Sequence, residues 1–368
     1  MKRDNSPVPL VFLLEDLDFG GTQRQTLELA SRLDRRRFEP LLVTLHGGSG
    51  DLLPEAASRG LKHLSLTDGP VFRVSRALPA LWQFLARERP PLLQLLTVLP
   101  NIWGRIFGRL LRLPAVIACC RSLTAAGDQH ERLLHRQADA HICNAEAVRD
   151  ILKQKIRIPG HRVFYIPNGV DTEYFRPPDA EAERPSVLCT ARLAPVKNHA
   201  LLLEAFARVL RDRPDAELHL AGDGVLREKI LEMSRRTPLR GKVFLHGNCR
   251  NVRELLHKAQ LFVLASDNEG TPNAVLEAMS CALPVLATNV GGNAEAVLHE
   301  RTGLLFPAGD PAAAADGMLR MLNDAGERAR FGRAGRERAL EAYSWRAMVE
   351  KHEEVYERTL HGRAGKRR

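Results

Sequence analysis

The stretch Leu261–Asn289, "LFVLASDNEGTPNAVLEAMSCALPVLATN", predicts the fold of the second half of the chain. It begins with a short apolar run, "LFVLAS". A loop with glycine and proline then leads into the helical segment "NAVLEAMSC" and a second apolar run, "LPVLATN". Two short buried runs joined by a helix are typical of a βαβ unit with parallel strands. In such a unit, the loop after the first strand lies at the sheet edge where ligands usually bind.

The same alternation of apolar runs and helical segments extends along the chain in both directions. Further strands are expected at "PLVFLL", "EPLLVTL", "LKHLSL", "PLLQLL", "PAVIACC", "AHICN", "RVFYIP", "SVLCTARL", "AELHLAG", "KVFLHG" and "TGLLFPA". Helices are expected between them, for example at "GTQRQTLELASRLD" and "NHALLLEAFARVLRD", and the chain closes with a long helical segment. This alternation predicts an α/β protein built on parallel sheets.

Residues 167–185 interrupt the alternation with four prolines and several acidic residues, as expected of a hinge or linker. We therefore expect a Rossmann-like domain over residues 1–166 and a second one over residues 186–345. The parallel sheets of these two domains are expected to face each other across a cleft. The closing helix, 346–368, is expected to pack back onto the first domain.

The amino-acid composition indicates the class of protein and the kind of binding partner. Of 368 residues, 44% are hydrophobic and 27% charged, an ordinary balance for a globular protein, and the net charge of +10 favours an anionic partner. That partner could be a nucleotide, a phospholipid surface or nucleic acid. The six cysteines form no CxxC pair, so buried reduced thiols are expected. Val8–Leu14 is interpreted as a strand rather than a signal peptide, and the expected location is the cytoplasm or a membrane surface.

The start of the helix after "LFVLAS" is a candidate anion site. Pro272 fits the first helical turn, where a missing N–H costs little. The N–H groups of Thr271, Asn273 and Ala274, together with the helix dipole, suit an anion such as a diphosphate. Gly270 allows the ligand to approach the backbone closely.

Two glutamates, Glu269 and Glu277, lie eight positions apart on either side of this helix start. A carboxylate two turns inside the helix can accept two hydrogen bonds from a cis-diol such as that of a ribose. A carboxylate on the loop faces whatever lies beyond the phosphates, such as a sugar. Most pairs of acids at this spacing are simply solvated surface residues, so the interpretation depends on the neighbouring motifs.

Those motifs supply positive charge and flexible backbone. In "TARLAPVKNH", Arg192 and Lys197 follow a strand and can neutralise a diphosphate leaving group without a metal ion. The chain contains no HExxH motif, and no metal site is expected. In "DFGGTQRQ", Gly20 and Gly21 open the first helix and permit close contact with phosphate or sugar. An exposed basic loop and a simple tight turn are the alternatives for these two motifs.

Taken together, these motifs resemble those of a known family. The segments are "GGTQRQ", "NGVD", "ARLAPVKN", "AGDGVLREKI", "VFLHGN" and "EGTPNAVLEAMSCALPVLATNVGGNAEAV". In this order and spacing they resemble the retaining family-4 (group 1) glycosyltransferases of the GT-B fold. The resemblance covers nearly the whole chain and is strongest from Val187 to Pro307.

The resemblance implies transfer of a sugar from a nucleotide-sugar donor to a glycan or lipid-linked acceptor, in cell-envelope polysaccharide or glycolipid synthesis. It implies no cofactor and no metal. The first domain would carry the acceptor and the second domain the donor. By the same resemblance, Arg192, Lys197 and Glu269 are the catalytic residues, with Lys197 and Arg192 on the diphosphate and Glu277 on the ribose. The remaining donor-binding residues that it implies are Gly20, Gly21, Gly270, Thr271 and Asn273.

The chain departs from the family's pattern at three places. Relatives often carry a histidine near the reacting sugar after the fifth strand, where this chain reads "IACCRSLTAAGD" with Cys120 and Arg121. The fourth strand, "LLQLLTVLPN", also lacks the histidines often found there. The group that takes the acceptor proton is therefore open, and Arg121 is a weaker candidate for the donor phosphate. In "SCALP", Ala282 stands where glycine is usual, which is interpreted as a packing variation.

A possible membrane contact is the segment "NIWGRIFGRLLRLP", residues 101–114. Arg105, Arg109 and Arg112 fall on one side at helical spacing, among apolar residues. Such a helix can lie on an anionic membrane surface, or it can pack its apolar face on the sheet with its arginines in water. We favour packing on the sheet with the arginines in water, from where they could still touch lipid headgroups on the inner face of the cell membrane.

Two rival functions are considered beside the transferase. A nucleotide-sugar epimerase or hydrolase could share this scaffold, and turnover of the donor without an acceptor would favour it. A basic nucleic-acid-binding protein is the other alternative. With 5% aromatic residues and no helix-turn-helix, RRM or zinc-ligand spacing, nucleic acid is not expected as a partner.

Overall fold

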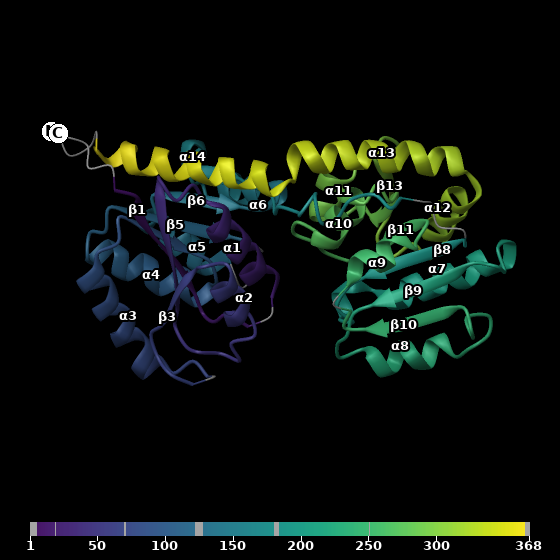
Figure 1. The fold of residues 1–368 in the computed structure, drawn as a ribbon, viewed down its shortest axis with the longest axis horizontal. Coiled ribbons are helices and arrows are strands. Elements are labelled where there is room, and N and C mark those ends of the chain that lie inside the picture. Colours follow the sequence, from purple (N-terminus) through teal and green to yellow (C-terminus); the bar gives the residue numbers. More distant parts are fainter. Residues whose placement is uncertain are drawn as a thin grey trace. The chain divides into compact units, whose positions relative to one another are not determined.

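The computed structural model describes residues 6–18, 20–69, 71–121, 128–179, 184–249 and 251–364. The chain divides into two compact units. Unit 1 comprises Met1–Asn168 and Trp345–Arg368, and unit 2 comprises Gly169–Ser344. Each unit contains one parallel sheet with helices between successive strands (Figure 1). The predicted α/β fold is confirmed.

Unit 1 has a seven-stranded sheet in the order β3-β2-β1-β4-β5-β6-β7 within its described residues. The strands are β1 (Val8–Leu14), β2 (Phe38–Thr44), β3 (Lys62–Ser65), β4 (Leu92–Leu95), β5 (Ala115–Cys120), β6 (Ala140–Cys143) and β7 (Val163–Tyr165). The helices are α1 (Gly21–Arg32), α2 (Leu53–Ser58), α3 (Val74–Glu88), α4 (Val98–Leu110), α5 (Asp128–Leu134), α6 (Glu146–Asp150) and α14 (Trp345–Ala364). Each strand overlaps a run that the sequence predicted. Buried strands such as β4 and β5 have little polar alternation because they are covered on both faces.

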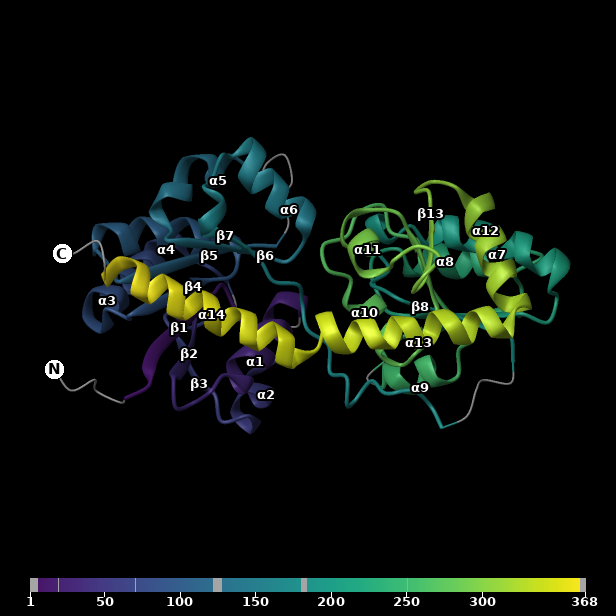
Figure 2. The same ribbon diagram turned by 90° about the horizontal axis from the view of Figure 1, so that it is seen from above.

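The sheet of unit 1 is covered on both faces. On one face, β-strand residues such as Phe12 share a buried cluster with Leu27 of α1 and with Tyr356 of α14. On the other face, the cluster contains Leu81 of α3 with Phe107 of α4 packed against it. Figure 2 shows α14 running along the sheet of unit 1.

The C-terminal helix is attached to unit 1 by polar contacts as well as by apolar ones. The hydroxyl of Tyr356, which is fully buried, donates a hydrogen bond to Gln94 of β4. Glu353 accepts a hydrogen bond from the backbone N–H of Asp34 at 2.9 Å and pairs with Arg37. The long helical segment expected at the end of the chain is interrupted at residues 343–344, so that α14 is separate from the helix before it.

Unit 2 has a six-stranded sheet in the order β10-β9-β8-β11-β12-β13 within its described residues. The strands are β8 (Ser186–Thr190), β9 (Glu217–Ala221), β10 (Val243–Gly247), β11 (Leu261–Leu264), β12 (Val285–Thr288) and β13 (Gly303–Phe306). The helices are α7 (His199–Asp212), α8 (Arg227–Ser234), α9 (Val252–His257), α10 (Asn273–Ser280), α11 (Gly291–Ala296), α12 (Pro311–Asn323) and α13 (Ala325–Ala342).

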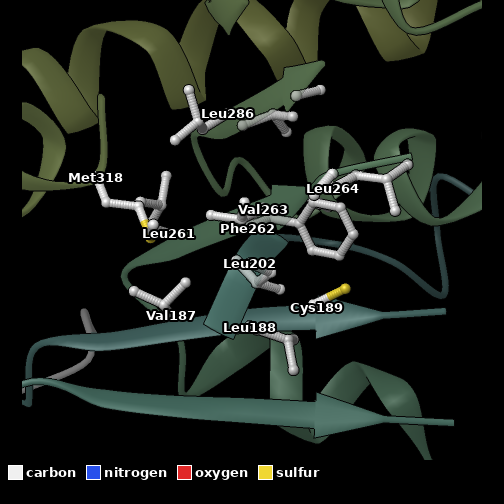
Figure 3. Packing of buried hydrophobic residues seen from close by; sticks show 14 of the residues in the cluster. Val187, Leu188, Cys189, Leu202, Leu261, Phe262, Val263, Leu264, Leu286 and Met318 are labelled. Carbon is white, nitrogen blue, oxygen red and sulfur yellow. The ribbon is translucent and has the colours of Figure 1, made fainter. Parts of the chain in front are cut away.

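The core of unit 2 forms around its two central strands. Every residue of β11 is buried, and Phe262 is fully enclosed. Figure 3 shows this strand packed among Leu202 of α7, Leu286 of β12 and Met318 of α12. Since the core fixes the direction of β8 and β11, it also fixes where the loops that follow them begin.

The expectation for the basic helix was partly wrong. Arg109 is exposed, as expected, but Arg105 is completely buried inside unit 1. Its guanidinium donates two hydrogen bonds, of 2.8 and 2.5 Å, to the carboxylate of Glu131 on α5, whose side chain is 2% exposed. A buried arginine requires such a counter-charge, and Glu131 lies 26 positions along the chain. Arg105 therefore cannot be part of a surface that meets lipid.

Ala282 has a structural cost that the sequence did not reveal. It follows α10 with a φ of +56°, in the left-handed region that favours glycine. The N–H of Leu283 donates to the carbonyl of Ala278 and the N–H of Ala282 to that of Met279, both at 3.0 Å. These are the two bonds of a Schellman motif, in which glycine is the usual residue at this position.

We expect Ala282→Gly to stabilise unit 2 by about 1 kcal/mol, because it removes the left-handed strain of a residue with a Cβ. Calorimetric unfolding measures this directly. The matched control is Ala207→Gly in the interior of α7, where the same chemical change should destabilise by about 1 kcal/mol. Equal destabilisation by both substitutions would contradict the prediction.

The thiols of the described residues are free. Cys119, Cys120, Cys143, Cys189 and Cys281 are buried, and Cys249 is partly exposed. The expectation of burial is confirmed for these five. Among the described helices, none combines the length and the apolar character needed to cross a membrane.

Candidate donor site

The strand order of unit 2 identifies the edge where a ligand would bind. From β8 the chain proceeds to β9 and β10 on one side of the sheet and later to β11, β12 and β13 on the other. The connections after β8 and β11 therefore lead to opposite sides of the sheet, so the carboxyl ends of these two strands mark the point where the strand order reverses. This is the position at which ligands bind in open parallel sheets.

Two predicted residues meet at this point. Lys197, in the loop after β8, forms an ion pair with Glu269, in the loop after β11. Their side chains are 21% and 9% exposed, respectively. The hydroxyl of Ser266 donates a second hydrogen bond, of 2.7 Å, to the same oxygen of Glu269. A mostly covered cation and a nearly buried carboxylate thus lie together at the carboxyl edge of the sheet.

The two loops are also joined by one backbone hydrogen bond and one side-chain hydrogen bond. The N–H of Asp267 donates to the carbonyl of Val196 at 2.9 Å, and the amide of Asn198 donates to the carboxylate of Asp267 at 2.9 Å. Asn198 has a φ of +46° and caps α7 by accepting from Leu201 at 3.3 Å. These contacts hold Lys197 in place opposite Glu269.

A pair of glycines not included among the predicted site residues supports the same loop. Gly291 and Gly292 open α11, which follows the neighbouring strand β12. A Cβ on Gly291 would lie 2.1 Å from the carbonyl oxygen of Glu269, and one on Gly292 would lie 1.6 Å from that of Gly270. Both contacts exclude a side chain. The motif "VGGN" after a buried strand was the available sequence signal.

Arg192 is exposed on the loop that leaves β8. The backbone beside it is held by the turn "AGDG": a Cβ on Gly222 would lie 2.0 Å from the carbonyl oxygen of Ala191. The N–H of Leu193 donates to the carbonyl of Asp223 at 2.9 Å. This glycine turn therefore positions the loop that carries Arg192.

The helix start after β11 differs slightly from the expectation. Pro272 precedes α10 as its cap residue and does not lie in its first turn, so the helix begins at Asn273. Glu277 lies one turn further along α10 and is partly exposed, as are Gly270 and Thr271 on the loop.

The positive charge of the loop after β8 comes from Arg192 and Lys197, not from the adjacent histidine. His199 is 1% exposed, and burial, reinforced by the charge of Lys197, lowers its pKa to about 4. It is therefore neutral at neutral pH. Within the described ranges, no group of three or more histidine, cysteine, aspartate or glutamate side chains is arranged to hold a metal ion.

The remaining predicted residues belong to unit 1. Gly20 precedes α1 and Gly21 is its first residue, directly after β1. A Cβ on Gly20 would lie 2.4 Å from the side-chain oxygen of Gln23. Arg121 follows β5 and donates to Asn168 at 2.7 Å. Residues 122–127 of the same loop lie outside the described residues.

Two family models match the chain in succession. The model described as Glycosyltransferase Family 4 matches residues 19–174, and the model described as Glycosyl transferases group 1 matches residues 170–338. The chain belongs to the family-4, group 1 glycosyltransferases. The resemblance of its motifs to this family is confirmed.

Curated relatives include enzymes with different acceptors. The N-acetyl-alpha-D-glucosaminyl L-malate synthase of Bacillus anthracis is 33% identical over 161 residues, covering 44% of this chain and 42% of the relative. A UDP-Gal:alpha-D-GlcNAc-diphosphoundecaprenol alpha-1,3-galactosyltransferase of Escherichia coli is 24% identical over 350 residues, covering 88% and 90%. The chain spans about half the length of the first curated relatives it matches, 42% to 55% in three of them.

Comparison with solved structures identifies the fold of this chain. The crystal structure of Anabaena HepE in complex with UDP and glucose superposes with a TM-score of 0.83 at 18% identity, over 95% of this chain and 99% of that one. At this identity the likeness concerns the fold alone. With the two family models, it identifies this family-4 glycosyltransferase as a GT-B protein with two Rossmann-like sheets.

Proposed function

We propose that this glycosyltransferase transfers a sugar, with retention of its anomeric configuration, from a nucleotide-sugar donor to a glycan or lipid-linked acceptor. The observation that carries the proposal is the contact of Lys197 with Glu269 at the carboxyl ends of β8 and β11, where the strand order reverses. This contact puts a cation and a carboxylate next to the N-terminal end of α10. The N-terminal end of a helix suits an anion.

The proposed roles follow from where charge develops. Breaking the bond between sugar and phosphate leaves negative charge on the diphosphate and positive character on the sugar carbon. Lys197 and Arg192 stabilise the negative charge on the diphosphate, so no metal is required in this scheme. Glu269 faces the positive character on the sugar carbon and orients the sugar, while the Gly270–Asn273 turn contacts the phosphates. Gly20 and Gly21 are proposed to contact the donor from unit 1.

The acceptor is proposed from two considerations. The Escherichia coli relative is named for a lipid diphosphate acceptor and is similar to this chain over most of its length. The net charge of +10 favours contact with an anionic membrane surface. We therefore propose a role in cell-envelope polysaccharide or glycolipid synthesis at the inner face of the cell membrane, with the protein bound peripherally.

The function is tested with a panel of nucleotide sugars, each incubated with and without a polyprenyl-diphosphate-linked sugar. We expect a new glycosidic bond only when both substrates are present, and NMR of the product should show the donor's anomeric configuration. Inversion of that configuration would contradict the retaining mechanism. Consumption of the donor without any acceptor would favour an epimerase or hydrolase instead.

We expect Glu277→Ala to weaken donor binding by about 1.5–3 kcal/mol, because the ribose diol would lose a charged acceptor of two hydrogen bonds. Calorimetric titration with the donor measures the change. The control is Glu341→Ala, an exposed glutamate on α13 of the same unit, which should leave donor affinity unchanged. Equal donor affinity in both variants would remove Glu277 from the site.

A further inference from the structure

A second site suited to anions lies in unit 1. A cleft of about 900 Å³ is lined by the C-terminal ends of α4 and α14 and by the segments that lead into β6 and β7. Its basic residues are Arg109, Arg112, Arg136, His161, Arg162 and Arg358. So many positive side chains around one cleft are unusual, because like charges repel unless an anion lies between them.

The cleft lies at the edge of the sheet opposite the one where Gly20 and Arg121 are found. Arg112 precedes β5, and Arg162 directly precedes β7. These are the amino ends of parallel strands, whereas Gly20 and Arg121 follow the carboxyl ends of β1 and β5. The cleft is therefore separate from the carboxyl edge that carries the candidate residues for sugar transfer.

The exposed arginines of the cleft have no acidic partner among the residues that the structure describes. In the part of the chain that the structure describes, Arg109, Arg112 and Arg136 form no ion pair. Asp139 is the one carboxylate among the described lining residues, and it accepts a hydrogen bond from the N–H of Val116 at 2.9 Å. The positive charge of the cleft is therefore available to bind an anionic ligand.

Other basic residues build the walls. Arg162 donates to the backbone carbonyls of Ala138 and Asp139, the latter at 3.1 Å, and so ties the start of β7 to the start of β6. Arg358 of α14 lies over the ring of Phe164, 5.3 Å from its centroid. The cleft is therefore a built feature of the fold, with walls from four separate parts of the chain.

Arg112 occupies a backbone position that favours glycine. Its φ is +55°, and the N–H of Leu113 donates to the carbonyl of Gly108 at 2.9 Å, as in a Schellman motif. An arginine here carries a conformational cost that a glycine would avoid. Strain of this kind, kept at one side chain of a charged cleft, points to a role for that side chain.

We propose that this cleft binds a phosphate-bearing anion, carried either by a lipid headgroup or by a soluble phosphate compound. Planar guanidinium groups bind phosphate through paired hydrogen bonds. The exposed Leu110 at the rim and the ring of Phe164 in the wall offer apolar surface to the carbon part of such a ligand. This proposal does not depend on the transfer reaction or on the donor site.

The test compares three full-length proteins: the unchanged chain, the cleft variant Arg109→Gln/Arg136→Gln, and the control variant Arg35→Gln/Arg76→Gln. The control removes the same charge from exposed positions of unit 1 outside the cleft. Two probes are used at low salt: sedimentation with phosphatidylglycerol vesicles, against phosphatidylcholine vesicles, and calorimetric titration with inorganic phosphate. Thermal unfolding checks that all three proteins fold equally well.

We expect the cleft variant to lose about tenfold or more in affinity for at least one probe, while the control variant changes by about twofold at most. A loss confined to vesicles identifies a lipid headgroup, and a loss with inorganic phosphate identifies a soluble compound. Equal losses in the cleft and control variants, or no binding of either probe to the unchanged chain, would overturn the proposal.

Discussion

Lys197→Ala and Glu269→Gln are each expected to lower the turnover number of sugar transfer by on the order of a hundredfold or more. In the proposed mechanism, both side chains face charges that grow as the bond between sugar and diphosphate breaks. Groups that act mainly in the transition state lower turnover more than substrate affinity when they are removed. The Michaelis constant for the donor should therefore change much less than the turnover number.

The ion pair between these residues requires a control for stability. Because Glu269 is nearly buried, removing Lys197 leaves a poorly solvated carboxylate and also lowers stability. Glu269→Gln keeps a partner for Ser266 and is the milder change. Thermal unfolding of each variant separates a loss of folded protein from a loss of catalysis.

Neighbouring exposed residues provide the matched comparison. Glu228→Gln and Lys229→Ala on α8 make the same chemical changes at exposed positions of unit 2. Both should retain full activity. If Glu269→Gln behaved like Glu228→Gln in turnover and in donor affinity, Glu269 would be only a structural loop residue.

The second large effect concerns stability. Arg105→Met is expected to destabilise unit 1 by about 3–5 kcal/mol at neutral pH, because it leaves the carboxylate of Glu131 buried without its main counter-charge. Arg109→Met, one turn further along α4 but exposed, should change stability by about 0.5 kcal/mol or less. Replacing both partners, as in Arg105→Met/Glu131→Leu, should recover much of the loss.

The pH dependence of this effect has a definite sign. Burial alone would raise the pKa of Glu131, but hydrogen bonds from His130 and Arg105 outweigh it and hold the pKa well below the usual value. In the unchanged protein, the pair stabilises fully above the unfolded pKa of about 4.3, and this stability is lost as the pH falls through the folded pKa. Without Arg105, burial raises the pKa instead, so the variant should lose stability as the pH rises.

Tryptophan fluorescence makes this measurement specific to unit 1. All three tryptophans of the chain, Trp82, Trp103 and Trp345, belong to that unit. Urea unfolding followed by their fluorescence therefore reports the unit that contains the substitution. A loss of stability in Arg105→Met no larger than that in Arg109→Met, or one that does not grow between pH 5 and pH 8, would contradict the prediction.

The sequence predicted the strands because buried parallel strands are short, almost wholly apolar and separated by helices. It also indicated which loops meet, since the carboxyl ends of adjacent parallel strands lie at one sheet edge. That argument brought Lys197 and Glu269 to the same region. It did not predict their direct contact, which depends on the hydrogen bonds between Val196, Asn198 and Asp267.

Other features depend on partners far away in the sequence. Helical spacing assigned Arg105 to the surface with Arg109, since nothing local distinguishes the two. Only the position of Glu131, on a different helix, explains why Arg105 is buried. The contact of Gly292 with the carbonyl of Gly270 likewise joins two βα loops, so the sequence around either glycine could not reveal it.

The return of α14 to unit 1 has a consequence for the order in which the chain folds during synthesis. Tyr356 is fully buried in the core of unit 1, so that core stays incomplete until the last helix has been made. Unit 2 is continuous from Gly169 to Ser344 and has its whole sequence available earlier. At typical ribosome speeds, roughly 10–40 s separate the synthesis of Asn168 from that of Ala364. During this interval the nascent unit 1 exposes the apolar surface that α14 later covers, which makes it a substrate for chaperones that hold apolar segments.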